Sequence, residues 1–332
     1  MENRQIIIDS LPEKRLMREN FKIVSAPIPP VNEGEVLCRT RLVTIAAGSR
    51  AGLQGSASYA GAPQAGVVMN ATGICEIEAS KTESFKKGDL VICQSGWQDY
   101  SKQKASQCKK IIEDIDLHHY LGALGTNGLT AYFGFFQIGD PTPGETVVIS
   151  AAAGSVGHLV GQFAKLKGCE TIGITSDALK CSQLTNRLGF DKAVSYRSQQ
   201  FRGELKDACP EGIDIFFDNV GGDVLGTALF RMKEHGRIVC CGAISQYDTN
   251  EPSGSPRGIP GLLVNKRIRM EGFLVFDYEK EYSQAREKIK EMIRNSEIDP
   301  MNDIFNGLER APEAFVDLLS GGNIGTRIIT VN

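Results

Sequence analysis

The sequence of 332 residues predicts an α/β protein built from two domains, one rich in β-strands and one with a parallel sheet covered by helices. Two patterns lead to this prediction. Up to about residue 120, short β-branched or alternating runs are separated by turns, which is typical of a β-sandwich or barrel. From there on, apolar strands alternate with helical segments, which is the pattern of βαβ units. The length also exceeds the usual size of a single domain.

Each expected element is a periodic or apolar run that ends at turn residues. The strands of the first part are Gln5–Ile8, Glu35–Ile45, Gly66–Ile77 and Asp89–Cys93. Those of the second part are Thr146–Ser150, Cys169–Thr175, Lys192–Ser195, Ile213–Phe217, Gly236–Cys241 and Arg267–Val275. The helices between them are Ser155–Lys167, Asp177–Leu188, Phe201–Ala208 and Gly222–Met232. Two helices, Tyr278–Asn295 and Glu313–Leu319, and a strand, Gly325–Val331, follow.

Charge and hydropathy exclude several classes of protein. The 37 basic and 40 acidic side chains give a net charge of −3, so no basic field is present to attract nucleic acid or anionic lipid. No apolar run approaches the ~20 residues that a membrane span requires, and the first residues lack the apolar segment of a signal peptide. The sequence therefore predicts a cytoplasmic protein with a small-molecule substrate.

The cysteines and histidines predict no metal site. The nine cysteines are scattered, odd in number and without a C-x-x-C pair, so we expect reduced thiols that pack as small buried side chains. The four histidines show no metal-binding spacing.

A glycine-rich turn follows the strand Thr146–Ser150 and reads A-x-x-G-x-x-G over Ala151–Gly157. Gly154 would let the backbone approach a pyrophosphate, and Gly157 would let the following helix pack closely on the strand. The helix N-terminus supplies N–H groups for phosphates. The alternative is a pair of packing glycines in a sheet that binds no nucleotide.

The residues after the next strand bear on the choice between NAD and NADPH. Asp177 stands where an NAD site places the acid that holds the ribose, or it caps the helix that starts there. Lys180 could meet a 2′-phosphate, with hydrogen bonds from Ser176 and Tyr196, or it could be a solvated surface lysine. The combination favours NADPH.

Two later turns, in Phe216–Gly222 and Val239–Ser245, also follow parallel strands. Ligands of open α/β sheets bind at the carboxyl ends of strands, so we expect both turns to border the nicotinamide half of the cofactor. Their glycines could alternatively serve the turns alone.

At this point the chain resembles a known family, the zinc-independent medium-chain dehydrogenase/reductases of the prostaglandin reductase and leukotriene B4 12-hydroxydehydrogenase type, with the plant and bacterial alkenal double-bond reductases. The resemblance covers nearly the whole chain. The motifs that carry it are Leu121-Gly122 through Tyr132, Ala151–Gly157, Gly161-Gln162, Ala164-Lys165, Leu188–Asp191, Phe217–Gly222, Gly236–Ile238, Gly242–Tyr247, Gly307–Glu309 and Gly321–Gly325.

The resemblance implies a GroES-like β-barrel catalytic domain from residues 1–120 and 271–332, a Rossmann doubly wound domain from 121–270, NADPH as cofactor and a homodimer. The positions it implies for cofactor binding are Asn127, Thr130, Gly154, Ser155, Val156, Thr175, Ser176, Lys180, Tyr196, Asn219, Cys241, Gly242, Ala243, Ile244, Ser245, Tyr247, Phe273, Leu274, Val275, Asn323 and Gly325.

The chain departs from the family pattern at two usual tyrosines. Where many members have D-P-Y-M-R, this chain reads Ala46–Arg50 and keeps only Arg50, and Asn265 replaces a tyrosine before Arg269-Met270-Glu271. The residues of the zinc-dependent relatives, including G-H-E around Gly66, are also missing. We therefore expect no zinc.

The candidate hydrogen-bond donor to a substrate carbonyl is the nicotinamide ribose hydroxyl, assisted by Asn265, Ser49 or Tyr59, and the candidate pocket residues are Arg50 and Trp97. The predicted reaction is NADPH-dependent reduction of the C=C bond of an α,β-unsaturated ketone or aldehyde, with hydride transfer to the β-carbon and stabilisation of the developing enolate. The alternatives are a quinone or carbonyl reductase on the same fold and a nucleotide-binding protein without catalysis.

Overall fold

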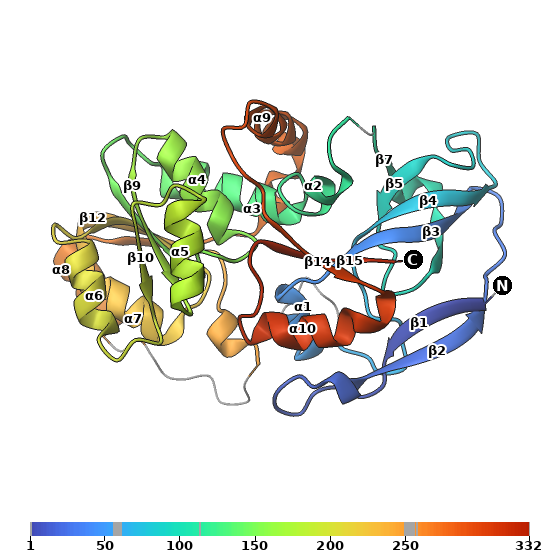
Figure 1. The fold of residues 1–332 in the computed structure, drawn as a ribbon, viewed down its shortest axis with the longest axis horizontal. Coiled ribbons are helices and arrows are strands. Elements are labelled where there is room, and N and C mark those ends of the chain that lie inside the picture. Colours follow the sequence, from blue (N-terminus) through green and yellow to red (C-terminus); the bar gives the residue numbers. More distant parts are fainter. Residues whose placement is uncertain (1, 56–61, 113, 249–255, 257, 332) are drawn as a thin grey trace. The chain divides into compact units, whose positions relative to one another are not determined.

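The computed structural model describes residues 2–55, 62–112, 114–248, 256 and 258–331, and it divides the chain into two compact units. Unit 1 comprises Met1–Leu121 with Asn302–Asn332, and unit 2 is the continuous segment Gly122–Met301 (Figure 1). The resemblance placed the second boundary at 271, whereas residues 271–301 belong to unit 2. The reason is that β13 (Arg269–Gly272) pairs with β12 (Met232–Cys240), and α9 (Tyr282–Arg294) packs on α3 (Thr126–Phe133).

Unit 1 consists mainly of antiparallel strands. Its elements are β1 (Glu2–Ile8), β2 (Phe21–Pro27), β3 (Glu35–Thr44), α1 (Gly48–Leu53), β4 (Gly73–Ser80), β5 (Leu90–Cys93), β6 (Tyr100–Lys104), β7 (Lys109–Lys110), α2 (Leu117–Leu121), β14 (Asn302–Asn306), α10 (Ala311–Leu319) and β15 (Thr326–Thr330). The larger sheet runs β14-β15-β3-β4-β5-β7, and β6 also pairs with β3. Strands β6, β3, β4, β5 and β7 pair in this order around one apolar cluster, and we call them the small barrel of unit 1.

Among the three apolar clusters that the described residues form in unit 1, two hold together segments that are distant in the sequence. One fills the small barrel and contains Val36, Ile77 and Val91 with four cysteines. The other joins the β1–β2 hairpin to α10, where Trp97 contacts Phe21 and Phe315 at ring-centroid distances of 5.3 and 5.9 Å. Trp97 is therefore part of the core of this unit.

Unit 2 is built around a parallel sheet with the order β10-β9-β8-β11-β12-β13. Its remaining elements are α3, a π-helical segment (Gly134–Gly139), β8 (Thr146–Ser150), α4 (Gly157–Leu166), β9 (Glu170–Thr175), α5 (Ala178–Asn186), β10 (Lys192–Ser195), α6 (Phe201–Ala208), β11 (Ile213–Asp218), α7 (Gly222–Arg231), α8 (Ile259–Lys266) and α9. If these six strands are numbered by their order in the chain, their order across the sheet is 3-2-1-4-5-6, which is that of dinucleotide-binding sheets. The chain first adds strands on one side of β8 and then continues on its other side, so the switch point lies between β8 and β11.

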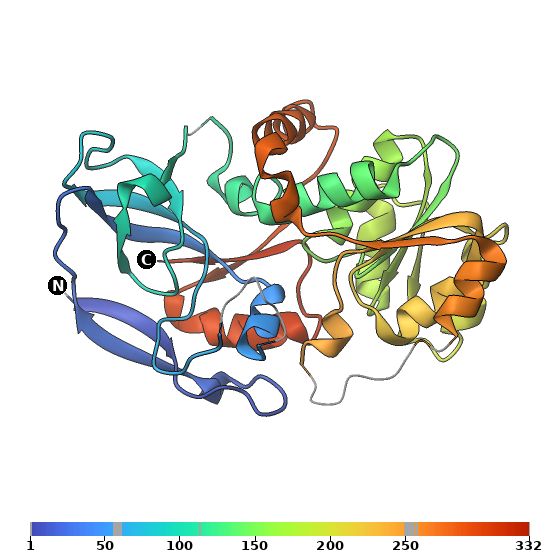
Figure 2. The same cartoon turned by 180° about the vertical axis from the view of Figure 1, so that it is seen from behind.

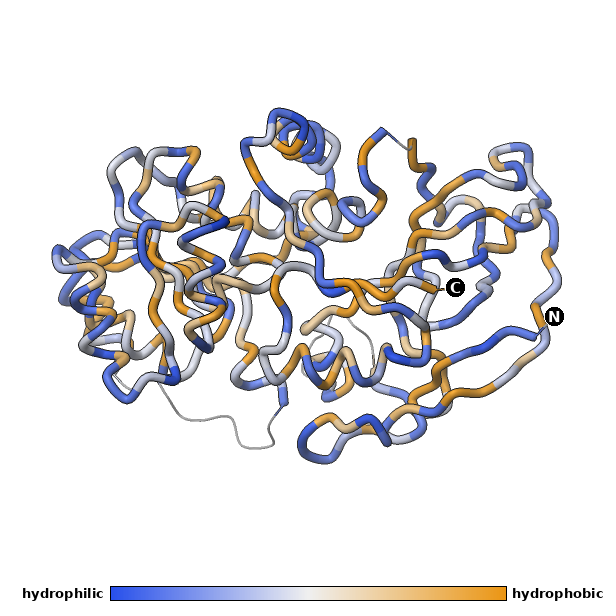
Figure 3. Tube along the Cα trace, in the orientation of Figure 1, coloured by the Kyte–Doolittle hydropathy of each residue, from blue (hydrophilic) through white to orange (hydrophobic). Residues whose placement is uncertain are grey.

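Helices cover both faces of this sheet (Figures 1 and 2). Residues of α6, α7 and α8 form one apolar cluster with the sheet, and right-handed crossovers place α4 and α5 on the opposite face. All five residues of β8 are buried, as expected for a strand covered on both faces. Figure 3 shows the same contrast in hydropathy, with apolar strands in the sheet and a largely hydrophilic α9.

The predicted fold class is confirmed. The predicted strand Lys192–Ser195 and helix Phe201–Ala208 agree with the structure at both ends. The predicted strand Gly66–Ile77 begins only at Gly73, because residues before it pair with β1 through one isolated bridge and loop hydrogen bonds. Among the described residues, no helix is long and apolar enough to cross a membrane.

Candidate active site

The glycine turn after β8 is compact because two glycines leave room for the backbone. The N–H of Gly154 donates to the carbonyl oxygen of Ala151 at 2.9 Å. A Cβ atom on Gly157 would lie 2.4 Å from that same oxygen, so only glycine fits at the start of α4. The turn therefore brings the N-terminus of α4 close to the end of β8, as a phosphate-binding turn requires.

His158 holds this turn from inside, a role that the sequence analysis missed. Its Nδ1 lies 2.8 Å from the carbonyl oxygen of Gly154, and its Nε2 accepts the N–H of Met301 at 3.2 Å. Because Nε2 is an acceptor, the proton is assigned to Nδ1. Burial lowers the pKa of His158 to about 4, which keeps the imidazole neutral.

The corner after β9 carries the residues predicted for a 2′-phosphate site. Asp177 caps α5, accepting the N–H of Lys180 at Oδ1 and the Ser176 hydroxyl at Oδ2. The Ser176 hydrogen bond, the Lys180 amide and the Lys180 charge hold the pKa of Asp177 below its ordinary value. Both carboxylate oxygens of Asp177 thus serve the helix start, which leaves them less suited to a ribose hydroxyl.

Lys180 is not a solvated surface lysine, because only 8% of it is exposed. Tyr196, by contrast, is exposed, and its N–H donates to the carbonyl oxygen of Thr175 at 2.9 Å. The structure therefore brings Thr175, Ser176, Lys180 and Tyr196 together at the carboxyl ends of β9 and β10.

A polar network joins the carboxyl ends of β8 and β11, where the sheet order reverses. The Ser150 hydroxyl donates to Asp218 Oδ1 at 2.8 Å and accepts the N–H of Asn219 at 2.8 Å. The Asn219 side-chain amide donates to the carbonyl oxygen of Ser150 at 2.8 Å. Burial raises the pKa of Asp218, while the N–H groups of Gly221 and Val220 and the Ser150 hydroxyl oppose this effect.

The loop after β12 is bonded to this network. The N–H groups of Cys241 and Gly242 donate to the carbonyl oxygen of Asp218, and the Ser245 hydroxyl donates to that of Val220. The Tyr247 hydroxyl accepts the N–H of Ala243 at 3.2 Å and so helps to hold the loop. The two predicted loops, with Asn219 and residues 241–247, are therefore adjacent at one edge of the sheet.

Helix α3 and the residues after β13 lie near the same edge. A Cβ atom on Gly134 would clash with the rings of Phe217 and Phe273, so the end of α3 packs directly on both. The π-helical segment then runs toward the amino end of the sheet, where the Ile138 carbonyl oxygen accepts from Arg269. Asn127 and Thr130 precede Gly134 and thus lie on the carboxyl side. Leu274 and Val275 directly follow Phe273.

Asn265 is not brought together with these loops, which corrects its predicted role beside the nicotinamide. It is exposed near the C-terminus of α8, and β13 begins four residues later. The neighbouring Lys266 donates to the carbonyl oxygen of Met232, the first residue of β12. Asn265 therefore lies at the amino end of the strands, whereas the loops lie at the carboxyl ends.

Three other predicted residues, Tyr59, Asn323 and Gly325, lie in the two sequence segments of unit 1. Asn323 donates its amide to the carbonyl oxygen of Gly325 at 2.9 Å, and both residues belong to unit 1. Their contact with a cofactor remains a prediction. Tyr59 lies outside the described residues.

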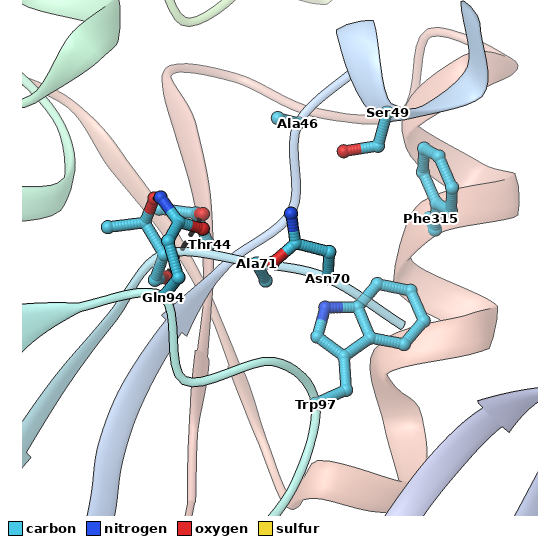
Figure 4. Close-up of a pocket in the computed structure, with 9 residues that line it drawn as sticks. Thr44, Ala46, Ser49, Asn70, Ala71, Gln94, Trp97 and Phe315 are labelled. Carbon is cyan, nitrogen blue, oxygen red and sulfur yellow. Dashed lines mark hydrogen bonds between the residues drawn. The ribbon is translucent and has the colours of Figure 1, made fainter. Parts of the chain in front are cut away.

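Unit 1 contains a cavity of about 140 Å³ that is lined by both polar and aromatic residues (Figure 4). Ser49 and Trp97, two of the predicted residues, line it, together with Thr44, Ala46, Asn70, Ala71, Thr72, Gln94 and Phe315. Figure 4 shows the Ser49 hydroxyl turned toward the interior, with the Asn70 amide and the Trp97 and Phe315 rings around it. The indole N–H of Trp97 is buried without a hydrogen-bond partner among the described residues.

The sequence analysis missed Asn70 and Phe315, because no local motif marks them and Phe315 comes from the far end of the chain. Arg50, which the sequence analysis predicted in the substrate pocket, is not among the residues that line this cavity. Arg50 is fully buried and donates to the carbonyl oxygen of Lys14 at 2.6 Å. It therefore anchors the segment after β1.

Comparisons with known proteins agree with this architecture. Residues 4–111 match a family described as the N-terminal domain of oxidoreductase, and residues 155–291 match one described as zinc-binding dehydrogenase. The chain is 42% identical to a 2-alkenal reductase (NADP(+)-dependent) of Nicotiana tabacum, over 83% of this chain and 80% of the relative. It is 35% identical to the NADPH-dependent curcumin reductase of Escherichia coli, over 99% and 97%.

A solved structure, that of CurA from Vibrio vulnificus in complex with NADPH, superposes with a TM-score of 0.94 at 35% identity and covers 99% of both chains. Similarity at this level over nearly the full length, together with the two family matches, leaves no doubt about descent. The chain belongs to the zinc-independent medium-chain dehydrogenase/reductases, in the group of the alkenal, curcumin and prostaglandin reductases.

Proposed function

We propose that the chain is an NADPH-dependent reductase of C=C bonds conjugated to a ketone or aldehyde. The single observation that best supports this proposal is the assembly of a phosphate-binding glycine turn and a buried lysine corner at the carboxyl edge of one sheet. The relatives are named for the same chemistry, as reductases of 2-alkenals, pulegone, curcumin and prostaglandins.

The described residues fit NADPH. The turn 154–157 presents backbone N–H groups where a side chain on Gly157 would not fit, which suits a pyrophosphate. We assign Ser176, Lys180 and Tyr196 to the 2′-phosphate, because a lysine ammonium and hydroxyl groups bind phosphate oxygens and these residues stand at the carboxyl ends of β9 and β10. Asn219 and the loop 241–247 would hold the nicotinamide half. We also assign Asn323 and Gly325 of unit 1 to cofactor binding.

When bound, NADPH supplies the hydride that reaches the β-carbon of the substrate. The chain's own part is to bind the substrate carbonyl and to stabilise the negative charge that develops on its oxygen. We assign the Ser49 hydroxyl, the Asn70 amide and the Trp97 indole N–H to this task, because all three line one cavity of unit 1. The rings of Trp97 and Phe315 restrict water there.

The test is NADPH oxidation with four substrates: an enone, an enal, a quinone and a saturated ketone, each followed by product analysis. A saturated ketone as the product from the enone supports the proposal. An allylic alcohol from the enone, or turnover of the quinone alone, would instead indicate a carbonyl or quinone reductase. Tight NADPH binding with no turnover of any substrate would indicate a binding protein.

We further propose that the protein is a cytoplasmic homodimer. Strand β13 ends the parallel sheet in the described part of the chain, and apolar side chains near it in sequence are exposed, with Val264 at 73% and Phe276 at 55%. An open sheet edge beside exposed apolar groups favours pairing with a second copy. Light scattering should give twice the chain mass of 36.1 kDa; the single-chain mass would contradict the dimer.

The cysteines support the proposed location in the cytoplasm. All nine are free thiols, which suits a reducing compartment.

A further inference from the structure

The barrel of unit 1 gathers four cysteines that are far apart in the sequence. Cys38 lies on β3, Cys75 on β4, Cys93 on β5, and Cys108 between β6 and β7. The sulfur atoms of Cys38, Cys93 and Cys108 all lie within 4.8 Å of one another, and Cys75 Sγ lies 3.7 Å from Cys93 Sγ. The sequence analysis expected isolated thiols, because the spacing along the chain gives no sign of this cluster.

The spacing of the sulfur atoms suits a thiophilic cation. Zinc binds thiolate sulfur at about 2.3 Å, so ligands around one tetrahedral zinc ion stand about 3.8 Å apart, and three in a plane about 4 Å apart. The separations among Cys38, Cys93 and Cys108, at most 4.8 Å, need a contraction of up to about 1 Å to reach these values, and Cys75, which is close to Cys93, must move toward the other two sulfur atoms. Soft thiolate ligands select zinc or copper(I) over magnesium or calcium.

The surroundings of the cluster supply a second, independent observation. Ser101 on β6 is the direct register partner of Cys38, so both side chains emerge on the same face of the sheet. The Ser101 hydroxyl is buried and has no hydrogen-bond partner in the described part of the chain. A hydroxyl in this position could donate to a metal-bound thiolate, as residues behind metal ligands commonly do.

We propose that Cys38, Cys93 and Cys108, with Cys75 as the fourth ligand, form a structural site for Zn²⁺ inside the barrel of unit 1. All four positions are filled by protein sulfur, so the site has no open position for a substrate and takes no part in hydride transfer. Bound metal would instead tie together β3, β4, β5 and the β6–β7 connection of the small barrel. Cys108, with 8% exposure, is the most accessible of the four and marks the entry side.

The test uses the full-length protein, loaded with Zn²⁺ under reducing conditions, passed over a chelating resin and analysed for metal by mass spectrometry. The wild-type chain is expected to retain one zinc per chain, and its thermal unfolding midpoint is expected to rise on loading. Cys93→Ala and Cys108→Ala are expected to retain at least tenfold less zinc and to show no such rise. Replacement of zinc by Co²⁺ should give the visible absorption of a tetrahedral thiolate complex.

Cys169→Ala is the matched control, because Cys169 is also buried and, like Cys108, donates to a backbone carbonyl oxygen, but it belongs to unit 2. It should retain zinc at the wild-type level. Circular dichroism and NADPH binding establish which variants are folded, and Cys108→Ala, at the most exposed position, serves if Cys93→Ala does not fold. No zinc in the folded wild type, equal zinc in the folded variants, or a mass two hydrogens lower from a disulfide would each overturn the proposal.

Discussion

The imidazole of His158 lies 2.8 Å from the carbonyl oxygen of Gly154 and thereby ties the first turn of α4 to the loop that precedes it. On its other side the ring accepts the N–H of Met301, near the end of unit 2. A neutral histidine in this position links the proposed phosphate-binding turn to the C-terminal end of the same unit. Protonation at Nε2 would replace an acceptor with a donor and break the second contact.

This relationship predicts that stability falls in mildly acidic solution. The pKa of His158 in the folded chain is about 4, below the ordinary value of 6.5. Between pH 4 and pH 6.5, His158 is therefore protonated in the unfolded chain but neutral in the folded chain. The stabilising effect is complete above pH 6.5 and is lost as the pH falls toward 4. Between pH 7 and pH 5 the wild type should lose about 2 kcal/mol through this group. Urea unfolding of His158→Gln should show a correspondingly weaker pH dependence; an unchanged slope would show that other groups cause it.

Replacement of Lys180 should change the preference between cofactors. Loss of a charged partner for a 2′-phosphate costs about 1.5–3 kcal/mol, so Lys180→Ala should raise the Kd of NADPH by roughly 10–100-fold and leave that of NADH within about twofold. Fluorescence titration with both cofactors gives the comparison. Lys165→Ala is the control, because Lys165 is bound to Asp191 on the protein surface. Equal losses for both cofactors in Lys180→Ala would remove this lysine from the 2′-phosphate site.

Gly157→Ala should open the turn. The new Cβ atom would meet the backbone of Ala151 and Ala152 at 2.4 and 2.8 Å, so the turn must shift. We expect a loss of about 1–3 kcal/mol in stability and at least tenfold weaker NADPH binding. The control is Gly203→Ala in α6, where a Cβ atom meets nothing within 4 Å and should stabilise the helix by about 0.5–1 kcal/mol. Normal NADPH affinity in Gly157→Ala would argue against contact between this turn and the pyrophosphate.

Ser49→Ala tests the cavity of unit 1. Removal of one hydrogen-bond donor to the developing oxyanion should lower kcat/KM for an enone by about 10–100-fold, with NADPH affinity unchanged. Trp97→Phe should act in the same direction, because it removes the indole N–H but keeps an aromatic ring against Phe21 and Phe315. Asn265→Ala, at the opposite edge of the sheet of unit 2, should retain wild-type turnover. The assignment fails if Ser49→Ala keeps full kcat/KM.

The fold of unit 2 could be predicted from the sequence because its signals are local. The apolar strand Thr146–Ser150 and the glycines behind it form a motif within a dozen residues, and each βαβ unit repeats the pattern. The N-cap of α5 could also be predicted locally, because Asp177 stands directly before the helix, where its carboxylate can accept a backbone N–H.

The rest depends on contacts between distant segments, which no local pattern encodes. Phe315 and Ser49 meet in one cavity from opposite ends of the chain, and Cys38 and Cys108 meet only inside the small barrel. Arg50 and Asn265 were assigned by their place in a family motif. The structure buries Arg50 beside the cavity lining rather than in it, and it places Asn265 at the amino end of the sheet of unit 2.

The insertion of unit 2 between the two segments of unit 1 has a consequence for synthesis on the ribosome. Strand β15 pairs with both β14 and β3, so the large sheet of unit 1 lacks an interior strand until the last residues of the chain have been made. At ~5–20 residues per second, the nascent β3 waits roughly 15–60 s for this partner, while the continuous segment of unit 2 can already fold. Unit 1 therefore completes its large sheet only after the continuous segment of unit 2 has been made, and the edge of β3 stays unpaired with β15 during that time.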